Sequence, residues 1–138
     1  MKVKVTPSKV HGNVKIPASK SMAHRALICA SLSDGTSIVS NVTNSKDIEA
    51  TVGCMKALGA KIKQIDETTY EVTGTNLFKQ EGNITCNANE SGSTLRFLIP
   101  LAACTNAKVK FLGQGRLLQR PMDVYENEFK EQNIEFNQ

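Results

Sequence analysis

The sequence predicts an α+β domain built from repeated β-α-β-α-β-β units, with one complete unit and most of a second. Strand and helix signals alternate along the chain, with no linker or low-complexity tract between them. The same order of elements begins again after about seventy residues. The length of 138 residues suits one domain with a buried core and is too short for two.

The first unit is expected over residues 13–75, and a strand at 1–12 precedes it. Period-two alternation predicts strands at 2–6 and 13–16, and Pro17 ends the second. Apolar residues on one face then predict a helix over 21–32, and β-branched residues predict a strand over 36–41.

A second helix is expected over 45–58, with Asn44 as its N-cap and Gly59 as its stop. The strands at 60–65 and 69–73 flank a short Asp-Glu-Thr turn, which predicts a hairpin.

The second unit is expected over residues 83–138 and lacks its last strand. Its predicted elements are a strand at 83–87, a helix at 91–105, a strand at 107–113, a helix from Pro121 to Gln132 and the start of a strand at 134–136. A hairpin with one strand missing leaves an open sheet edge. We therefore expect the chain to be a piece of something longer, or to borrow a strand from a neighbouring copy.

Composition excludes several classes of protein. Hydrophobic residues are 40% and charged residues 22%, as in globular domains, and no apolar run approaches the roughly 20 residues of a membrane span. The net charge of +4 and aromatic content of 5% argue against a nucleic-acid partner. The four cysteines and two histidines show no metal-ligand spacing, so we expect no metal, and we expect reduced, buried thiols in a cytoplasmic protein.

The segment Pro17-Ala18-Ser19-Lys20-Ser21, with Arg25 one turn further on, carries the first chemical signal. A strand ends and a helix begins there, so free backbone N–H groups and the positive end of the helix dipole meet two hydroxyls and two cations. Together these groups predict a pocket for phosphate or carboxylate. The alternative is that Ser21 is an N-cap and that Lys20 and Arg25 are solvated.

Two further segments carry related signals in the second unit. Residues 87–96 repeat the helix-start pattern, with Ser91 and Arg96 matched to Ser21 and Arg25, and Gly92 would let a ligand approach the backbone. Residues 113–122 form a loop with two arginines, of which Arg120 directly precedes a proline. Taken singly, they could be a capping segment and a mobile surface loop, and their symmetry with the first segment favours anion binding.

These motifs resemble the EPSP synthase (3-phosphoshikimate 1-carboxyvinyltransferase) family of enolpyruvyl transferases. The matching stretches are IPASKSMAHRALICASLSDGTS, NESGSTLRFLIPLAA and GRLLQRPM, and the similarity covers nearly all of this chain. The resemblance implies two domains of three units each, with the active site between them. This chain would then be roughly the first third of the family's chain, and its first strand would pack with the second domain.

The resemblance also implies roles for individual residues. Lys20, Ser21 and Arg25 would bind shikimate 3-phosphate, and Lys20, Gly92 and Arg120 would bind phosphoenolpyruvate, with Lys20 as the catalytic residue in this part. Glu90 stands where the family more often has Asn, so we do not count it as a ligand. No cofactor is implied.

The acid–base carboxylates of the family lie in the second domain, so this part alone is expected to be inactive. A rival hypothesis from another class is a stand-alone anion-binding or assembly module that pairs through its open edge. A relative that binds or processes RNA is a third hypothesis, which the low aromatic content disfavours.

Overall fold

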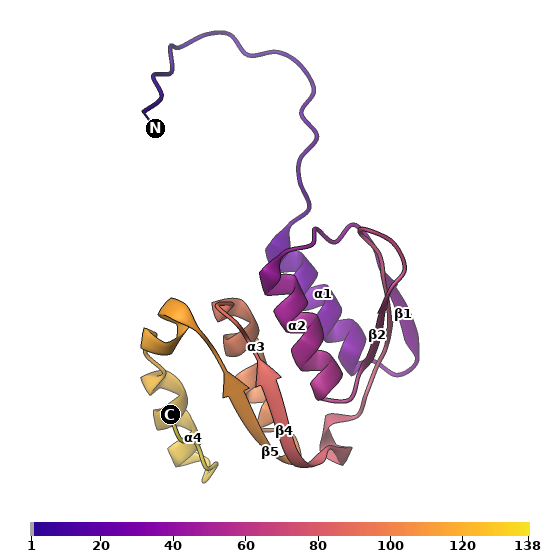
Figure 1. Cartoon of the computed structure of the whole chain (residues 1–138), viewed down its shortest axis with the longest axis vertical. Helices are drawn as coiled ribbons and strands as arrows, with labels where there is room; N and C mark the ends of the chain where they lie inside the picture. The colour runs from indigo at the N-terminus through magenta and orange to yellow at the C-terminus, as the bar shows by residue number, and fades with distance from the viewer. Residues whose placement is uncertain (1) are drawn as a thin grey trace.

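The computed structural model describes residues 2–138. Residues 2–19 run as an extended, mostly exposed segment that leads away from the folded body (Figure 1). The body consists of two halves, each with two helices and the strands around them. Eleven elements follow one another: α1 Lys20–Leu32, β1 Thr36–Val39, α2 Lys46–Ala57, β2 Lys61–Gln64, β3 Tyr70–Thr73, the 3-10 turn Leu77–Lys79, β4 Glu81–Asn87, α3 Gly92–Ala102, β5 Asn106–Leu112, the 3-10 turn Gly115–Gln119 and α4 Asp123–Glu131.

The strands form two separate sheets. In the first half, β3 lies between β1 and β2 and is antiparallel to both, with Ile62 opposite Val72. This pairing confirms the predicted hairpin. In the second half, β4 and β5 pair in parallel, with Ile84 opposite Val109.

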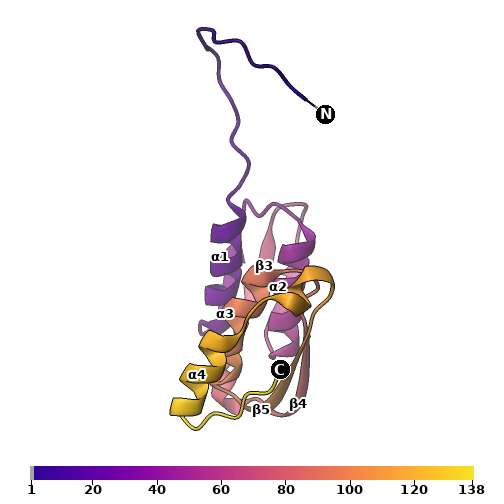
Figure 2. The same ribbon diagram turned by 90° about the vertical axis from the view of Figure 1, so that its left-hand side faces the viewer.

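Helices α1 and α2 lie between the three-stranded sheet and the second half of the molecule (Figure 1). One apolar cluster therefore spans both halves. Its fully buried members include Leu27 of α1, Ile48 and Met55 of α2, and Leu98 of α3. A smaller cluster around Ile99, Met122 and Phe129 fixes α4 against α3, as seen from the side in Figure 2.

The predicted helix starts need small corrections that matter for the site. The N-cap of α1 is Ser19 rather than Ser21, and the N-cap of α2 is Ser45 rather than Asn44. Asn44 instead donates to the Glu67 carbonyl and accepts from the Tyr70 hydroxyl. The fourth helix begins at Asp123, two residues after Pro121.

Three predicted strands are absent from residues 2–138. The segments 2–6 and 13–16 are exposed and unpaired, because alternation of residue types makes a strand only where a neighbour accepts its hydrogen bonds. At the other end, residues 134–136 form no ladder, and Ile134 and Phe136 pack on the small cluster around Phe129 instead. Among the described residues no further strand pairs with the outer strands of either sheet, which are β1 and β2 in the first and β4 and β5 in the second.

Two of the four cysteines depart from the expectation of burial. Cys54 and Cys86 are buried, and Cys29 and Cys104 are exposed. A hydrogen bond with Cys86, together with burial, raises the pKa of the Cys54 thiol well above its ordinary value, so Cys54 stays protonated.

Candidate anion-binding site

Three helix N-termini lie close together and form the framework of the candidate site. Ser19, Ser45 and Ser91 cap α1, α2 and α3, each with its side-chain oxygen accepting a backbone N–H from the first turn. Helices α1 and α2 run in the same direction, since contacts between them recur at a spacing of 27 residues. The positive ends of three helix dipoles thus point to one side of the molecule.

Lys20 is held at this end by an ion pair between α1 and α2. Its Nζ donates to Asp47 Oδ2 at 2.9 Å, the one salt bridge among the described residues. Both side chains are partly exposed, at 54% and 37%, so the pair adds little stability. Its effect is to aim the ammonium across the start of α2 while Lys20 remains accessible to an anion.

Arg25 is fixed by two contacts. Its Nη1 donates to the Ser21 carbonyl at 2.8 Å, and its guanidinium carbon lies 4.9 Å from the centre of the Phe97 ring on α3. A cation over an aromatic face is favourable, and the ring blocks other orientations. Ser21 itself is exposed in the first turn, so its hydroxyl can reach a ligand. The structure therefore brings Lys20, Ser21 and Arg25 together on the first two turns of α1.

Gly92 and Arg120 meet at the start of α3. A Cβ atom at Gly92 would clash with Arg120 Nη1, so the guanidinium occupies the space that any other side chain would fill. Arg120 follows the 3-10 turn Gly115–Gln119, and its backbone N–H donates to the Leu117 carbonyl. These two predicted residues are thus in contact, as a shared role at an anion would require.

Glu90 lies against the same loop. A Cβ atom at Gly115 would clash with Glu90 Oε1, and Gly115 adopts a positive φ of 57°. The backbone of this loop is tied down alongside, because Gln114 N–H donates to the Asn89 carbonyl at 2.8 Å. The Glu90 carboxylate therefore packs on the loop that carries Arg120.

Beneath these residues, buried polar side chains connect α1 to α2 and α2 to α3. His24 of α1 and Thr51 of α2 are linked at 2.7 Å, and Thr51 and Thr94 of α3 are linked at 2.7 Å. Burial lowers the pKa of His24 from its ordinary value of 6.5, so the ring is neutral near pH 7. Sequence reasoning missed Asp47, Thr51 and Thr94. The contacts of Asp47 with Lys20 and of Thr51 with His24 share a spacing of 27 residues, which has meaning only once α1 and α2 are known to be parallel.

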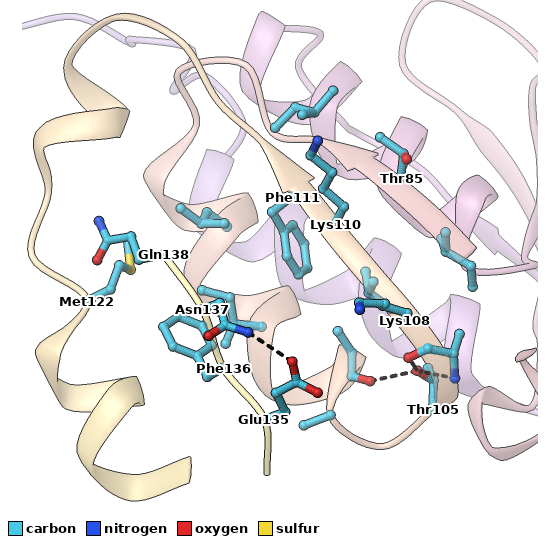
Figure 3. A pocket seen from close by; sticks show the side chains of 18 of the residues that line it. Thr85, Thr105, Lys108, Lys110, Phe111, Met122, Glu135, Phe136, Asn137 and Gln138 are labelled. Carbon is cyan, nitrogen blue, oxygen red and sulfur yellow. Dashed lines mark hydrogen bonds between the residues drawn. The ribbon is translucent and has the colours of Figure 1, made fainter. Parts of the chain in front are cut away.

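A large open pocket lies elsewhere. It has a volume of about 1050 Å³ and lies between β5, α3, α4 and the last residues of the chain, and Figure 3 shows Phe111, Met122 and Phe136 beside it. None of the five predicted site residues lines it. Its walls are mostly apolar, and although Lys108 and Lys110 line it, no helix N-terminus with a capping serine opens onto it, so we place the site at the starts of α1, α2 and α3 instead.

Searches for two other kinds of site gave nothing among residues 2–138. No group of histidine, cysteine, aspartate or glutamate side chains there could hold a metal ion. None of the helices in this range is long and apolar enough to cross a membrane.

Comparison with known proteins gives consistent matches. The sequence model of the family described as EPSP synthase (3-phosphoshikimate 1-carboxyvinyltransferase) matches residues 4–137. Proteins named 3-phosphoshikimate 1-carboxyvinyltransferase are 50% identical in Clostridium perfringens strain SM101 and 45% identical in Clostridioides difficile strain 630. These matches cover 99% and 98% of this chain, and 32% and 33% of the relatives. The chain thus spans about a third of the length of the relatives it matches.

Solved structures show the same fold. Two structures of EPSP synthase from Acinetobacter baumannii match with TM-scores of 0.73 and 0.70, at 19% and 20% sequence identity. They cover 90% and 87% of this chain, which in turn matches 28% and 27% of theirs.

Proposed function

Since the chain belongs to the EPSP synthase family, we propose that it is the N-terminal part of an enzyme that joins phosphoenolpyruvate to shikimate 3-phosphate. The enolpyruvyl group would pass to the 5-hydroxyl of shikimate 3-phosphate, and inorganic phosphate would leave. The observation that carries this proposal is the meeting of three helix N-termini with Lys20, Arg25 and Arg120 on one side of the molecule.

The arrangement suits two anions held side by side. Lys20, Ser21 and Arg25 would hold the phosphate of shikimate 3-phosphate on α1. Gly92 and Arg120 would hold phosphoenolpyruvate at the start of α3, where the absence of a side chain on Gly92 leaves room for the Arg120 guanidinium. Lys20 would lie between the two ligands, and one ammonium would then offset charge on both.

The proposed reaction is an addition followed by an elimination. The 5-hydroxyl oxygen loses its proton and forms a bond to C2 of phosphoenolpyruvate while C3 takes up a proton, which gives a tetrahedral intermediate. The bond from C2 to the phosphate oxygen then breaks, C3 loses a proton, and the enolpyruvyl ether remains. The residues of this chain would contribute by holding the reactants close and by offsetting their charge.

Proton transfer would depend on groups outside this part, so we expect this chain to bind both substrates weakly and to form no product. Isothermal titration with shikimate 3-phosphate, alone and with phosphoenolpyruvate, tests the binding. The double variant Lys20→Ala/Arg25→Ala should lose it, since each charge-assisted hydrogen bond contributes about 1.5–3 kcal/mol.

A charge-matched control is available away from the site. Lys56→Ala/Lys61→Ala removes two exposed cations, one in the last turn of α2, about 15 Å from the helix start by helix length, and one at the start of β2. This variant should bind like the unaltered chain. If a folded chain binds neither anion, or if both double variants weaken binding equally, the proposed site is wrong.

A further inference from the structure

A continuous run of hydrogen bonds lies beneath the site and joins α1, α2 and α3. It passes from His24 Nδ1 to Thr51 Oγ1, then to Thr94 Oγ1 and to Ser91 Oγ, and each step measures 2.7 Å. His24 and Ser91 are 2% exposed, and Thr51 and Thr94 are fully buried. No water competes for these groups, so their geometry depends on one another.

Each hydroxyl has one hydrogen to donate, and this fixes which group is the donor in each hydrogen bond of the run. Thr94 Oγ1 donates to Ser91 Oγ or to the Asp47 carbonyl, which lies 3.2 Å away and can only accept. Thr51 is then the donor to Thr94, and His24 Nδ1–H is the donor to Thr51. This leaves His24 Nε2 as a bare acceptor, the one buried side-chain polar atom without a partner among the described residues.

The run ends at both halves of the candidate site. Ser91 caps α3, where its Oγ also accepts the Thr94 N–H at 3.2 Å, and the next residue is Gly92, which contacts Arg120. The Asp47 carbonyl belongs to the same residue whose side chain holds Lys20. Thr94 thus touches Ser91, the neighbour of Gly92 in the chain, and the backbone of Asp47, whose side chain holds Lys20.

We propose that His24 is a positioning residue that sets, through Thr51 and Thr94, the separation between the anion site on α1 and the anion site at the start of α3. The inference rests on the proposed function, because it assumes that both sites work on one pair of substrates. Apolar residues of similar size would fill the same volume without leaving an unpaired buried nitrogen. Such apolar residues would lose the hydrogen bonds from His24 through Thr51 to Thr94, and these are the bonds that join the two anion sites.

Isosteric substitutions separate positioning from packing. Thr51→Val keeps the shape and removes the hydroxyl, and Thr51→Ser keeps the hydroxyl and removes a methyl group. Ser31→Ala is the matched control, because Ser31 is a fully buried hydroxyl of α1 that donates only to the nearby Leu27 carbonyl.

The first measurement is the coupling between ligands by isothermal titration. In the unaltered chain, saturating shikimate 3-phosphate should tighten phosphoenolpyruvate binding, and Thr51→Val should reduce this gain at least fivefold while binding of shikimate 3-phosphate alone changes less than twofold. Thr51→Ser and Ser31→Ala should keep the gain. Equal coupling in Thr51→Val and Thr51→Ser would overturn the inference.

The second measurement needs no substrate and so separates failure of this inference from failure of the proposed function. In heteronuclear NMR spectra, Thr51→Val should shift the Gly92 amide and Arg120 Nε–H resonances, although Thr51 touches neither residue, and Ser31→Ala should not. The His24 nitrogen shifts should show protonated Nδ1 and bare Nε2, with His11→Gln used for assignment. If those resonances do not move, the inference is wrong whatever the titrations show; His24→Asn gives the same comparison if Thr51→Val does not fold.

Discussion

The two halves of the molecule share the order helix, strand, helix (α1-β1-α2 and α3-β5-α4) and differ in the strands around it and in how well their cores are closed. In the first half, the β2–β3 hairpin and the helices α1 and α2 enclose a core with Leu27, Ile48 and Val72 fully buried. In the second half, β4 and β5 stand as a two-stranded sheet beside an open pocket of about 1050 Å³. The serine-capped starts of α1 and α3 are nevertheless alike. The candidate site therefore uses the part of the unit that does not depend on a complete sheet.

Shortening one buried leucine side chain in each half should show this difference in packing, and it is the largest effect that we expect. Leu27→Ala removes a fully buried side chain in the first half, and Leu117→Ala removes one that is 3% exposed beside the pocket in the second. We expect losses of about 3–5 kcal/mol and about 1–2 kcal/mol, because the second site already faces open volume. Urea unfolding measures both. Equal losses would mean that the second half is as tightly packed as the first.

Gly92→Ala tests whether the start of α3 acts as an anion site. The new methyl group would displace the Arg120 guanidinium, so phosphoenolpyruvate affinity should fall about tenfold, close to the loss in Arg120→Ala. Titration calorimetry measures this, with thermal unfolding to verify the fold. Wild-type affinity in Gly92→Ala would show that Arg120 does not act from its observed position.

The buried His24 side chain should make the free energy of unfolding depend on pH. Because the pKa of His24 is lowered by burial, against a weaker opposing effect of Asp47 and with help from Lys20 and Arg25, the unfolded chain takes up a proton below pH 6.5 that the folded chain does not. Stability should fall as the pH drops from 7 toward 5, by up to about 1.4 kcal/mol per unit.

Urea unfolding at several pH values measures this slope. His24→Asn should flatten it, and His11→Asn, at an exposed position, should leave it unchanged. Identical slopes in all three proteins would mean that another group governs the pH dependence.

The smallest expected effect is at the contact between α1 and α3. Phe97→Leu keeps an apolar side chain and removes the ring face under Arg25. A partly exposed cation–π contact contributes about 0.5–1 kcal/mol, so affinity for shikimate 3-phosphate should fall about two- to fivefold. Binding of phosphoenolpyruvate alone is the internal control. A larger loss for phosphoenolpyruvate than for shikimate 3-phosphate would contradict the assignment of Arg25.

Local patterns in the sequence were enough for most elements, since helix faces, turn residues and β-branched runs act over short distances. They failed for 13–16 and 134–136, where alternation is present and the paired neighbour is not. The predicted contacts within one helix turn are present, as between Ser21 and Arg25. Contacts that depend on how helices pack, such as those of Asp47 and Thr51, could not be read from spacing alone. The binding roles of the five site residues stay predictions.

The N-caps also correct how the two units are matched. Ser19 corresponds to Ser91, 72 residues later, instead of Ser21. Six positions after each cap stand Arg25 and Phe97, so the cation and the ring beneath it occupy equivalent places in the two copies. Arginine in both copies would bring like charges face to face, and phenylalanine in both would leave no cation for an anion. A tandem duplication with identical copies could not make this contact, so divergence at this one position is a condition for the site.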